Sequence, residues 1–192
     1  MKTTNIQTVG EEIANAVSHG LMTIFGIVAL VLLIIKSDST IEVTSAIIFG
    51  LSIINLYTMS TLYHSIFHQT AKGVFQRFDH LSIYILIGGT FAPMLLLLPA
   101  LQEPIFGIAG LGLGPVIFII QWILIALGVI FKSIWIKKYA KLHLVIYLAM
   151  GWSAMIFVQK LYVFDPRAFW FVLFGGISYS LGVAFYVFPK IK

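Results

Sequence analysis

A short polar segment near the start of the chain carries side chains that could do chemistry beside a long apolar stretch. Glu12, Asn15 and His19 are separated by three and four residues, so a helix would place them on one face. Thr8 and Glu11 have the spacing of a capping box, which marks where such a helix could begin. Ionisable side chains are costly inside a membrane, so those in or beside apolar segments are candidates for function.

A second group of polar side chains lies between residues 60 and 80. Ser60 and His64 are four residues apart, and so are His64 and His68, a spacing at which two histidines of one helix can chelate a metal ion. Asp79 and His80 are adjacent, so they would point about 100° apart on a helix, and we expect Asp79 to face the interior. A carboxylate there could orient a histidine ligand or act as a general base. The histidines could equally be hydrogen-bonding or interfacial residues of the helix ends.

The composition places these side chains in a membrane protein. The chain has 192 residues, of which 60% are hydrophobic and 10% are charged, and its mean hydropathy is +1.02. A soluble domain has about 25% charged residues, and a soluble fold of this length could not hide so much apolar surface from water. The same figures exclude a disordered chain, a coiled coil and a nucleic-acid-binding module. Because the chain has no cysteine, any metal would be held by His, Asp, Glu or water.

Six apolar stretches are long enough to cross a bilayer as helices, which takes about 20 residues. They are residues 13–35, 43–71, 81–102, 105–131, 142–159 and 168–189. None of them alternates with the period of two that the strands of a β-barrel require, and the segments between them are too short for a folded domain. The sequence therefore predicts an all-α integral membrane bundle of six helices, with residues 1–192 forming a single domain.

The charges of the short connecting segments predict the orientation of the bundle. If the N-terminus is cytoplasmic, the cytoplasmic side carries nine Lys and Arg residues and the other side three. The nine are Lys2, Lys72, Arg77, Lys132, Lys137, Lys138, Lys141, Lys190 and Lys192, and the three are Lys36, Lys160 and Arg167. Short loops rich in Lys and Arg stay in the cytoplasm, so we expect a protein of the cell membrane with its N-terminus inside. All five histidines, His143 included, then fall on the cytoplasmic side.

Several short motifs together resemble the bacterial hemolysin III family, which is related to the progestin and adiponectin receptors. The first motif is residues 11–20 (EEIANAVSHG), and the second is residues 60–64 (STLYH). A third comprises residues 78–80 (FDH) and 89–93 (GTFAP), and the later spans match at residues 147–152 and 175–182. The resemblance covers essentially the whole chain. It implies a fold of seven membrane helices and membership of a superfamily regarded as metal-dependent hydrolases.

The resemblance also implies a zinc ion near the cytoplasmic ends of the helices. The span-two histidine that binds zinc in the receptor branch matches His64, and the acid associated with the zinc-bound water matches Asp79. Ser60 matches a polar residue beside the site, and Glu12 and Asn15 match the first motif, which supports it. The two remaining zinc ligands of the family belong to a His-x-x-x-His motif in span seven. The chain stops where that span would begin, and we expect it to lack the last helix.

The expected site therefore has Asp79 and Ser60 as catalytic residues and His64 and Asp79 as metal ligands. Additional ligand candidates are the neighbouring histidines His68, His19 and His80, because the ligand set implied by the family is incomplete in this sequence.

Three classes of function agree with these residues. The first is a zinc-dependent hydrolase that cuts an amide or ester bond of a lipid, with Asp79 positioning the water. The second is a pore-forming cytolysin, as the family name suggests, although the six spans show no continuous polar stripe. The third is a non-catalytic regulator or receptor in membrane lipid homeostasis, with a polar cluster that is structural. Membrane lipids are the expected partners and nucleic acid is not, and the oligomeric state stays open.

Overall fold

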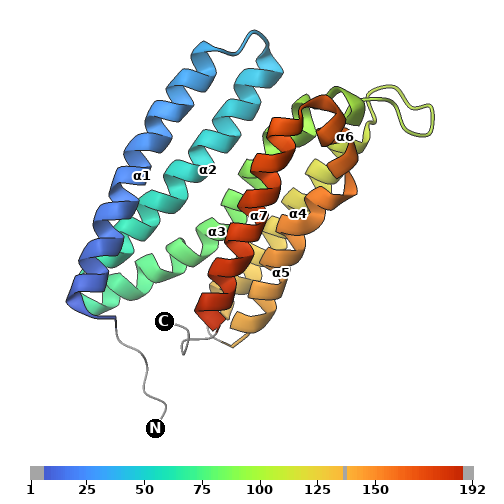
Figure 1. Cartoon of the computed structure of the whole chain (residues 1–192). Helices are drawn as coiled ribbons and strands as arrows, with labels where there is room; N and C mark the ends of the chain where they lie inside the picture. Colours follow the sequence, from blue (N-terminus) through green and yellow to red (C-terminus); the bar gives the residue numbers. More distant parts are fainter. Residues whose placement is uncertain (1–6, 136–137, 188–192) are drawn as a thin grey trace. The chain divides into compact units, whose positions relative to one another are not determined.

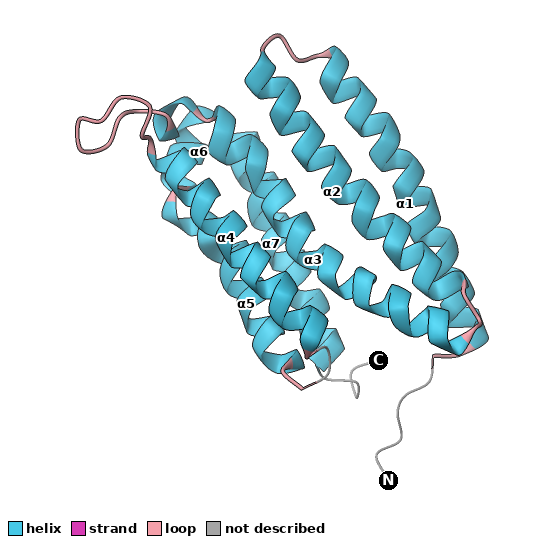
Figure 2. Ribbon diagram, turned by 180° about the vertical axis from the view of Figure 1, so that it is seen from behind, coloured by secondary structure: helices cyan, strands magenta, loops and turns pink. Residues whose placement is uncertain are grey.

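The described chain is helical, as the sequence predicts. The computed structural model describes residues 7–135 and 138–187. Its α-helices are α1 (Val9–Ile35), α2 (Thr40–Ser65), α3 (Gln69–Leu97), α4 (Leu113–Ile134), α5 (Ala140–Trp152), α6 (Val158–Phe164) and α7 (Pro166–Val187) (Figure 1). Two short 3-10 helices, η1 (Pro99–Leu101) and η2 (Ser153–Ile156), lie between them. Figure 2 shows only helices and loops over the described residues.

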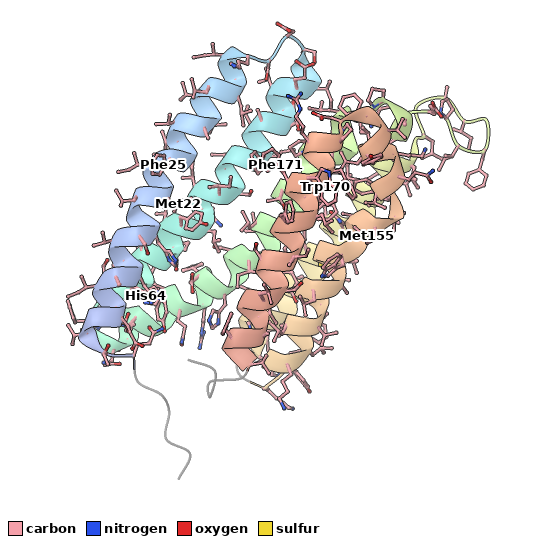
Figure 3. The ribbon with its side chains drawn as sticks, in the orientation of Figure 1. Met22, Phe25, His64, Met155, Trp170 and Phe171 are labelled. Atoms are coloured by element: carbon pink, nitrogen blue, oxygen red, sulfur yellow. The ribbon has the colours of Figure 1, made fainter. Side chains whose placement is uncertain are left out.

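The helices supply the predicted membrane spans. Five of them, α1, α2, α3, α4 and α7, are long and apolar enough to cross a membrane. The segment from α5 through α6 passes the same test as a pair bent by 54°, which gives up to six spans. Large apolar side chains such as Phe25, Trp170 and Phe171 remain exposed on the spans, as a lipid-facing surface requires (Figure 3). Five residues used in the predictions, Lys2, Lys137, Pro189, Lys190 and Lys192, lie outside the described residues.

The chain divides into two compact units, Met1–Thr90 and Phe91–Lys192, with the boundary inside α3. In the first unit, α1 and α2 form an antiparallel hairpin (Figures 1 and 2). The predicted capping box is present at the start of α1, because the Thr8 hydroxyl accepts from the Glu11 N–H and the Glu11 carboxylate accepts from the Thr8 N–H. The short connection between the two helices keeps them antiparallel neighbours.

Small and polar residues hold α3 against α2 in the same unit. A Cβ atom at Gly89 would clash with the Ser52 side chain, so glycine is required for this close approach. Further along the two helices, the Asn55 amide donates a hydrogen bond to the Ser82 hydroxyl at 2.9 Å. Ser52 and Ser82 are both buried. These contacts fix the end of α2 beside the start of α3, where the polar candidates of the sequence lie.

The second span ends earlier, and the third helix begins earlier, than the sequence predicts. We expected residues 43–71 and 81–102, but α2 ends at Ser65, Ile66 is extended, and α3 begins at Gln69. The apolar pair Ile66 and Phe67 carries the hydrophobic pattern across the break. Residues 69–80 are more polar, so hydropathy alone does not show that they continue the same helix as the third span.

His68 lies in this break and caps α3. Its carbonyl accepts from the Lys72 N–H at 2.8 Å, and its Nδ1 accepts from the Ala71 N–H at 3.4 Å. The prediction that His64 and His68 stack on one helix is therefore wrong, because α2 has ended between them.

The second unit has its own core, formed by the end of α3, η1 and the segment from α4 to α6. The buried apolar residues here are Phe91, Ala92, Leu95, Leu98, Leu101, Ile125, Tyr147, Met150, Ala154, Phe157 and Leu161. Polar side chains add two hydrogen bonds. The Gln121 amide on α4 donates to the Ser153 hydroxyl at 2.9 Å, and the Trp152 indole N–H on α5 donates to the Ser180 hydroxyl on α7 at 3.0 Å. The helices from α4 onward are therefore joined by contacts within this unit.

Two predicted span boundaries differ in this unit as well. We expected a span over residues 105–131, but α4 begins at Leu113, because Phe106, Gly107 and Gly110 adopt positive φ angles that a right-handed helix excludes. We expected a continuous span over 142–159, but η2 interrupts it. The Ser153 hydroxyl donates to the Met150 carbonyl at 2.6 Å there, a local bond that often bends helices.

Candidate functional site

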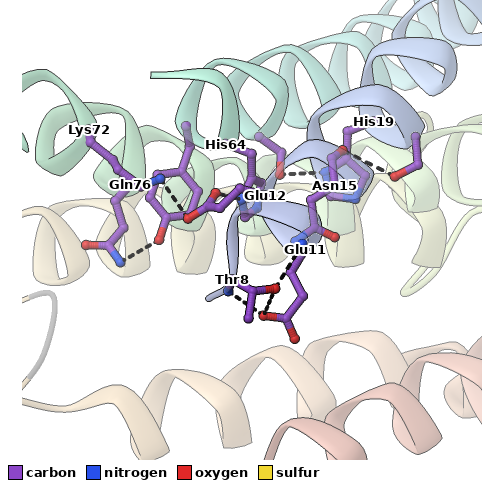
Figure 4. A network of polar contacts seen from close by, with 11 residues as sticks. Thr8, Glu11, Glu12, Asn15, His19, His64, Lys72 and Gln76 are labelled. Carbon is purple, nitrogen blue, oxygen red and sulfur yellow. Dashed lines mark hydrogen bonds and ion pairs between the residues drawn. The ribbon is translucent and has the colours of Figure 1, made fainter. Parts of the chain in front are cut away.

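A cluster of polar side chains lies at one end of the first unit, where α1 begins, α2 ends and α3 begins (Figure 4). Glu12 and His19 come from α1, Ser60 and His64 come from α2, and Lys72 comes from α3. We call these five residues the Glu12 cluster. Three separate helices thus converge on the site, as the predicted residues on the first three spans require, and Lys72 is the α3 residue that joins the cluster.

Glu12 is the centre of the cluster, because each of its carboxylate oxygens holds a different partner. Oε2 lies 2.7 Å from His64 Nδ1, and Oε1 lies 2.7 Å from Lys72 Nζ. The Glu12 side chain is 17% exposed and the His64 side chain is 8% exposed. A carboxylate can only accept, so Nδ1 of His64 donates the hydrogen bond. This leaves Nε2 as the ring nitrogen that can accept a proton or bind a metal.

A second histidine lies beside the first. His19 Nδ1 is 2.7 Å from the Ser60 hydroxyl, and the ring centroids of His19 and His64 are 6.0 Å apart. Glu12 and His19 thus face α2 from one side of α1, and Ser60 and His64 face α1 from one side of α2. The prediction that Glu12 and His19 share one helix face is confirmed, and so is the same prediction for Ser60 and His64, because the two pairs contact each other between α1 and α2.

Three residues that the sequence analysis did not single out complete the surroundings of His64. Lys72 Nζ lies 5.2 Å from the centroid of the Tyr63 ring, and the Gln76 amide donates to the Tyr63 hydroxyl at 3.1 Å. The Tyr63 ring also lies against His64, with centroids 4.5 Å apart. Lys72, Gln76 and Asp79 are four and three residues apart, so this helical spacing could have indicated a polar face on α3.

The remaining predicted residues are not among the five of the Glu12 cluster. Asp79 is half-buried on α3, and its carboxylate lies close enough to His19 for their charges to interact. Asn15 is half-buried on the same stretch of α1 as Glu12, and Figure 4 shows it between Glu12 and His19. His80 is half-buried next to Asp79, whereas His68 is exposed at the start of α3.

The zinc expectation can be tested against the donor atoms of this site. His64 has the environment of a metal-binding histidine, because a carboxylate fixes its ring through the nitrogen that would not bind the metal. A catalytic zinc takes three protein ligands and a water. Within residues 7–135 and 138–187, no group of three His, Asp or Glu side chains is arranged to hold a metal ion. The described residues therefore show no complete zinc site.

Comparison with known proteins agrees with the resemblance seen in the motifs. The sequence profile of the family described as haemolysin-III related matches residues 7–191. The Hemolysin-3 homolog of Bacillus subtilis is 41% identical over 188 residues, which cover 96% of this chain and 84% of the relative. Hemolysin-3 of Bacillus cereus is 37% identical over 189 residues, covering 96% of this chain and 82% of the relative.

The similarity extends to the receptor branch at a lower level. Human monocyte to macrophage differentiation factor is 29% identical over 184 residues, which cover 92% of this chain and 71% of the human protein. No solved structure matches. The family profile and the bacterial relatives both cover nearly the whole chain, and the chain has the apolar helices of a multi-pass membrane protein. This chain therefore belongs to the haemolysin-III related family of membrane proteins.

Proposed function

We propose that the chain is a membrane hydrolase that cuts an amide or ester bond of a lipid with zinc as its cofactor, and that the Glu12 cluster with Asp79 is its reaction centre. The observation that carries the proposal is the 2.7 Å contact between His64 Nδ1 and Glu12 Oε2, at an imidazole that is 8% exposed. This arrangement is typical of histidines that bind metals. We place this end of the unit at the cytoplasmic face of the cell membrane, following the Lys and Arg bias of the short loops.

Each residue of the site has a separate task in this proposal. Glu12 fixes the His64 ring so that Nε2 is directed away from the carboxylate and can ligate the ion. Ser60 holds the His19 ring in the same way through its hydroxyl. Asp79, half-buried beside them, would accept the proton of the attacking water as a general base. Zinc, when bound, would supply Lewis acidity to the lipid carbonyl and to the attacking water.

Lys72 balances the charge of the half-buried Glu12 carboxylate. Its ammonium lies 2.7 Å from Glu12 Oε1, on the side opposite His64, and its side chain is 22% exposed. The ammonium offsets the cost of this charge, since ionised groups without partners are unfavourable in apolar surroundings. With Lys72 in place, Glu12 stays an acceptor and His64 stays in the tautomer that the proposal needs.

The name of the Bacillus cereus relative, Hemolysin-3, favours a second candidate, a pore-forming cytolysin. A water-filled pore needs polar side chains along its whole length. On α1, the polar residues near Glu12 are followed by residues 24–35, which carry no polar side chain. Conductance of the purified protein in a planar bilayer would support the pore.

A third candidate, a non-catalytic regulator, predicts that the double variant Asp79→Ala/His64→Ala still complements a deletion strain.

Elemental analysis of the purified full chain tests the role of zinc. We expect about one zinc per chain in the wild type, since a catalytic site holds a single ion, and a loss of most of it in His64→Ala. His68→Ala is the matched control, because His68 is a nearby histidine that is exposed and caps α3. It should keep the zinc content of the wild type. Metal-free protein that hydrolyses a lipid amide or ester as fast as the untreated protein would overturn the proposal.

A further inference from the structure

A buried lysine lies at the end of α4 in the second unit. Lys132 is in the last turn of this helix, which ends at Ile134, and the residue is 5% exposed. Lysine is rarely buried to this extent without an ionic partner. Among the described residues of its unit, no carboxylate forms an ion pair with Lys132 and no side chain hydrogen-bonds to its ammonium. The carbonyl end of the helix attracts a cation, but this attraction is weaker than the cost of removing an ion from water.

Around Lys132, the described residues of this unit place a buried histidine and further lysines, and no carboxylate that pairs with it. His143 on α5 is 2% exposed and lies close enough to Lys132 for their charges to interact. Residues 132–143 contain four lysines and this histidine but no acid. The two acids of residues 91–192, Glu103 and Asp165, come before α4 and after α6, at the far ends of these helical segments. Among the described residues of this unit, no carboxylate therefore serves as the counterion of Lys132.

Aromatic side chains gather at this end of the helices. The Trp135 ring lies 5.2 Å from that of Phe131 and 6.0 Å from that of Tyr139, measured between centroids. Lys138 Nζ lies 5.2 Å from the Tyr139 centroid. Trp and Tyr are enriched where a membrane meets water. An aromatic belt with lysines at one helix end is the surrounding expected for lipid phosphate.

We propose that the end of the α4–α5 hairpin binds the phosphate of an anionic phospholipid, with Lys132 Nζ as the principal donor. A phosphate oxygen would satisfy the ammonium that no described carboxylate of the unit satisfies. Exposed apolar side chains flank the site on both helices, Ile134 on α4 and Leu142 and Val145 on α5, and they would contact the acyl chains. These chains distinguish a lipid from a free phosphate ion as the expected occupant.

Native mass spectrometry of the purified full chain, titrated with phosphatidylglycerol or with phosphatidylcholine of the same acyl chains, tests the proposal. We expect the wild type to bind phosphatidylglycerol more tightly. Lys132→Gln should weaken this binding about tenfold, the loss expected for one charge-assisted contact. It should weaken phosphatidylcholine binding less, because the choline cation of that lipid already pairs with its phosphate. Lys141→Gln removes the same charge from an exposed position of the same segment, and it should change the affinity by less than about twofold.

Three outcomes would overturn the proposal. Equal affinity of Lys132→Gln and the wild type for phosphatidylglycerol would remove Lys132 from the site. Displacement of phosphatidylglycerol by an equimolar concentration of inorganic phosphate would show a site for a soluble anion instead of a lipid. If Lys132→Gln does not fold, the wild type and Lys132→Arg decide the question. Both should prefer phosphatidylglycerol, and equal binding of the two lipids by the wild type would contradict the proposal.

Discussion

Two lysines at helix ends show two ways in which this chain keeps a positive charge in apolar surroundings. Lys72 is 22% exposed and contacts Glu12, whose second oxygen accepts from His64. Lys132 is 5% exposed and has no carboxylate partner among the described residues of its unit. Removing one partner of a buried pair strands the other charge, whereas removing a lone buried charge relieves a cost. Substitutions at the two sites should therefore change stability in opposite directions.

The largest effect is expected for Glu12→Gln, which leaves Lys72 without its counterion and gives His64 a neutral partner. Because these side chains are partly exposed, we expect a loss of about 2 kcal/mol of stability, which lowers the Tm by roughly 4–8 °C. Thermal unfolding in a neutral detergent measures it. Glu11→Gln changes the exposed cap beside it, and it should cost about 1 kcal/mol or less. A Glu12→Gln protein as stable as the wild type would contradict the paired-charge account.

Lys132→Met should raise the stability in the same neutral detergent, whereas Glu12→Gln lowers it. The substitution keeps an unbranched side chain and removes a buried charge that lacks a partner, so we expect a gain of about 1 kcal/mol, or roughly 2–4 °C in Tm. Lys72→Met is the matched control at the paired site, and it should lower the Tm. If both variants lower the Tm equally, the contrast between the two sites is wrong.

An effect of similar size to that of Lys132→Met, but of opposite sign, is expected for Ser60→Ala, which removes the partner of His19 Nδ1 at 2.7 Å. A buried hydrogen bond of this kind contributes about 1 kcal/mol, so the Tm should fall by roughly 2–4 °C. Ser18→Ala on α1 is the control, because the Ser18 hydroxyl is exposed and bonds only to the Asn15 carbonyl one turn earlier. It should be within about 0.5 kcal/mol of the wild type.

The smallest effect concerns Asp165, which lies between α6 and α7 and outside the spans. A hydrogen bond from the Arg167 N–H holds the pKa of Asp165 below its ordinary value of 3.8. Because folding lowers this pKa, the ionised Asp165 side chain stabilises the fold above the pKa of the unfolded state. This contribution is lost as the pH falls through the folded-state pKa. Asp165→Asn should therefore flatten the fall of Tm with pH below about 4.

The sequence predicts the part of the site that lies on α1, because the spacing of these residues follows helix geometry. Thr8 and Glu11 form their capping box, and Glu12 and His19 share a face, since spacing within one helix depends on local bonds alone. Lys72 was missed as a site residue, because the α2–α3 break that brings it to Glu12 is hidden in an apolar run. Hydropathy measures side chains and not backbone angles, so the positive φ values before α4 were missed as well.

The most direct test of the central claim is the turnover of a fluorogenic long-chain acyl amide or ester by the purified protein. Glu12→Gln replaces the carboxylate that fixes the His64 ring by an amide. Glu11→Gln makes the same replacement at the exposed residue that precedes Glu12. We predict that Glu12→Gln lowers kcat/KM by about 100-fold, as the loss of a residue that orients a metal ligand does, and that Glu11→Gln stays within about twofold of the wild type. Equal turnover by the two variants would contradict the assignment of the Glu12 cluster as the reaction centre.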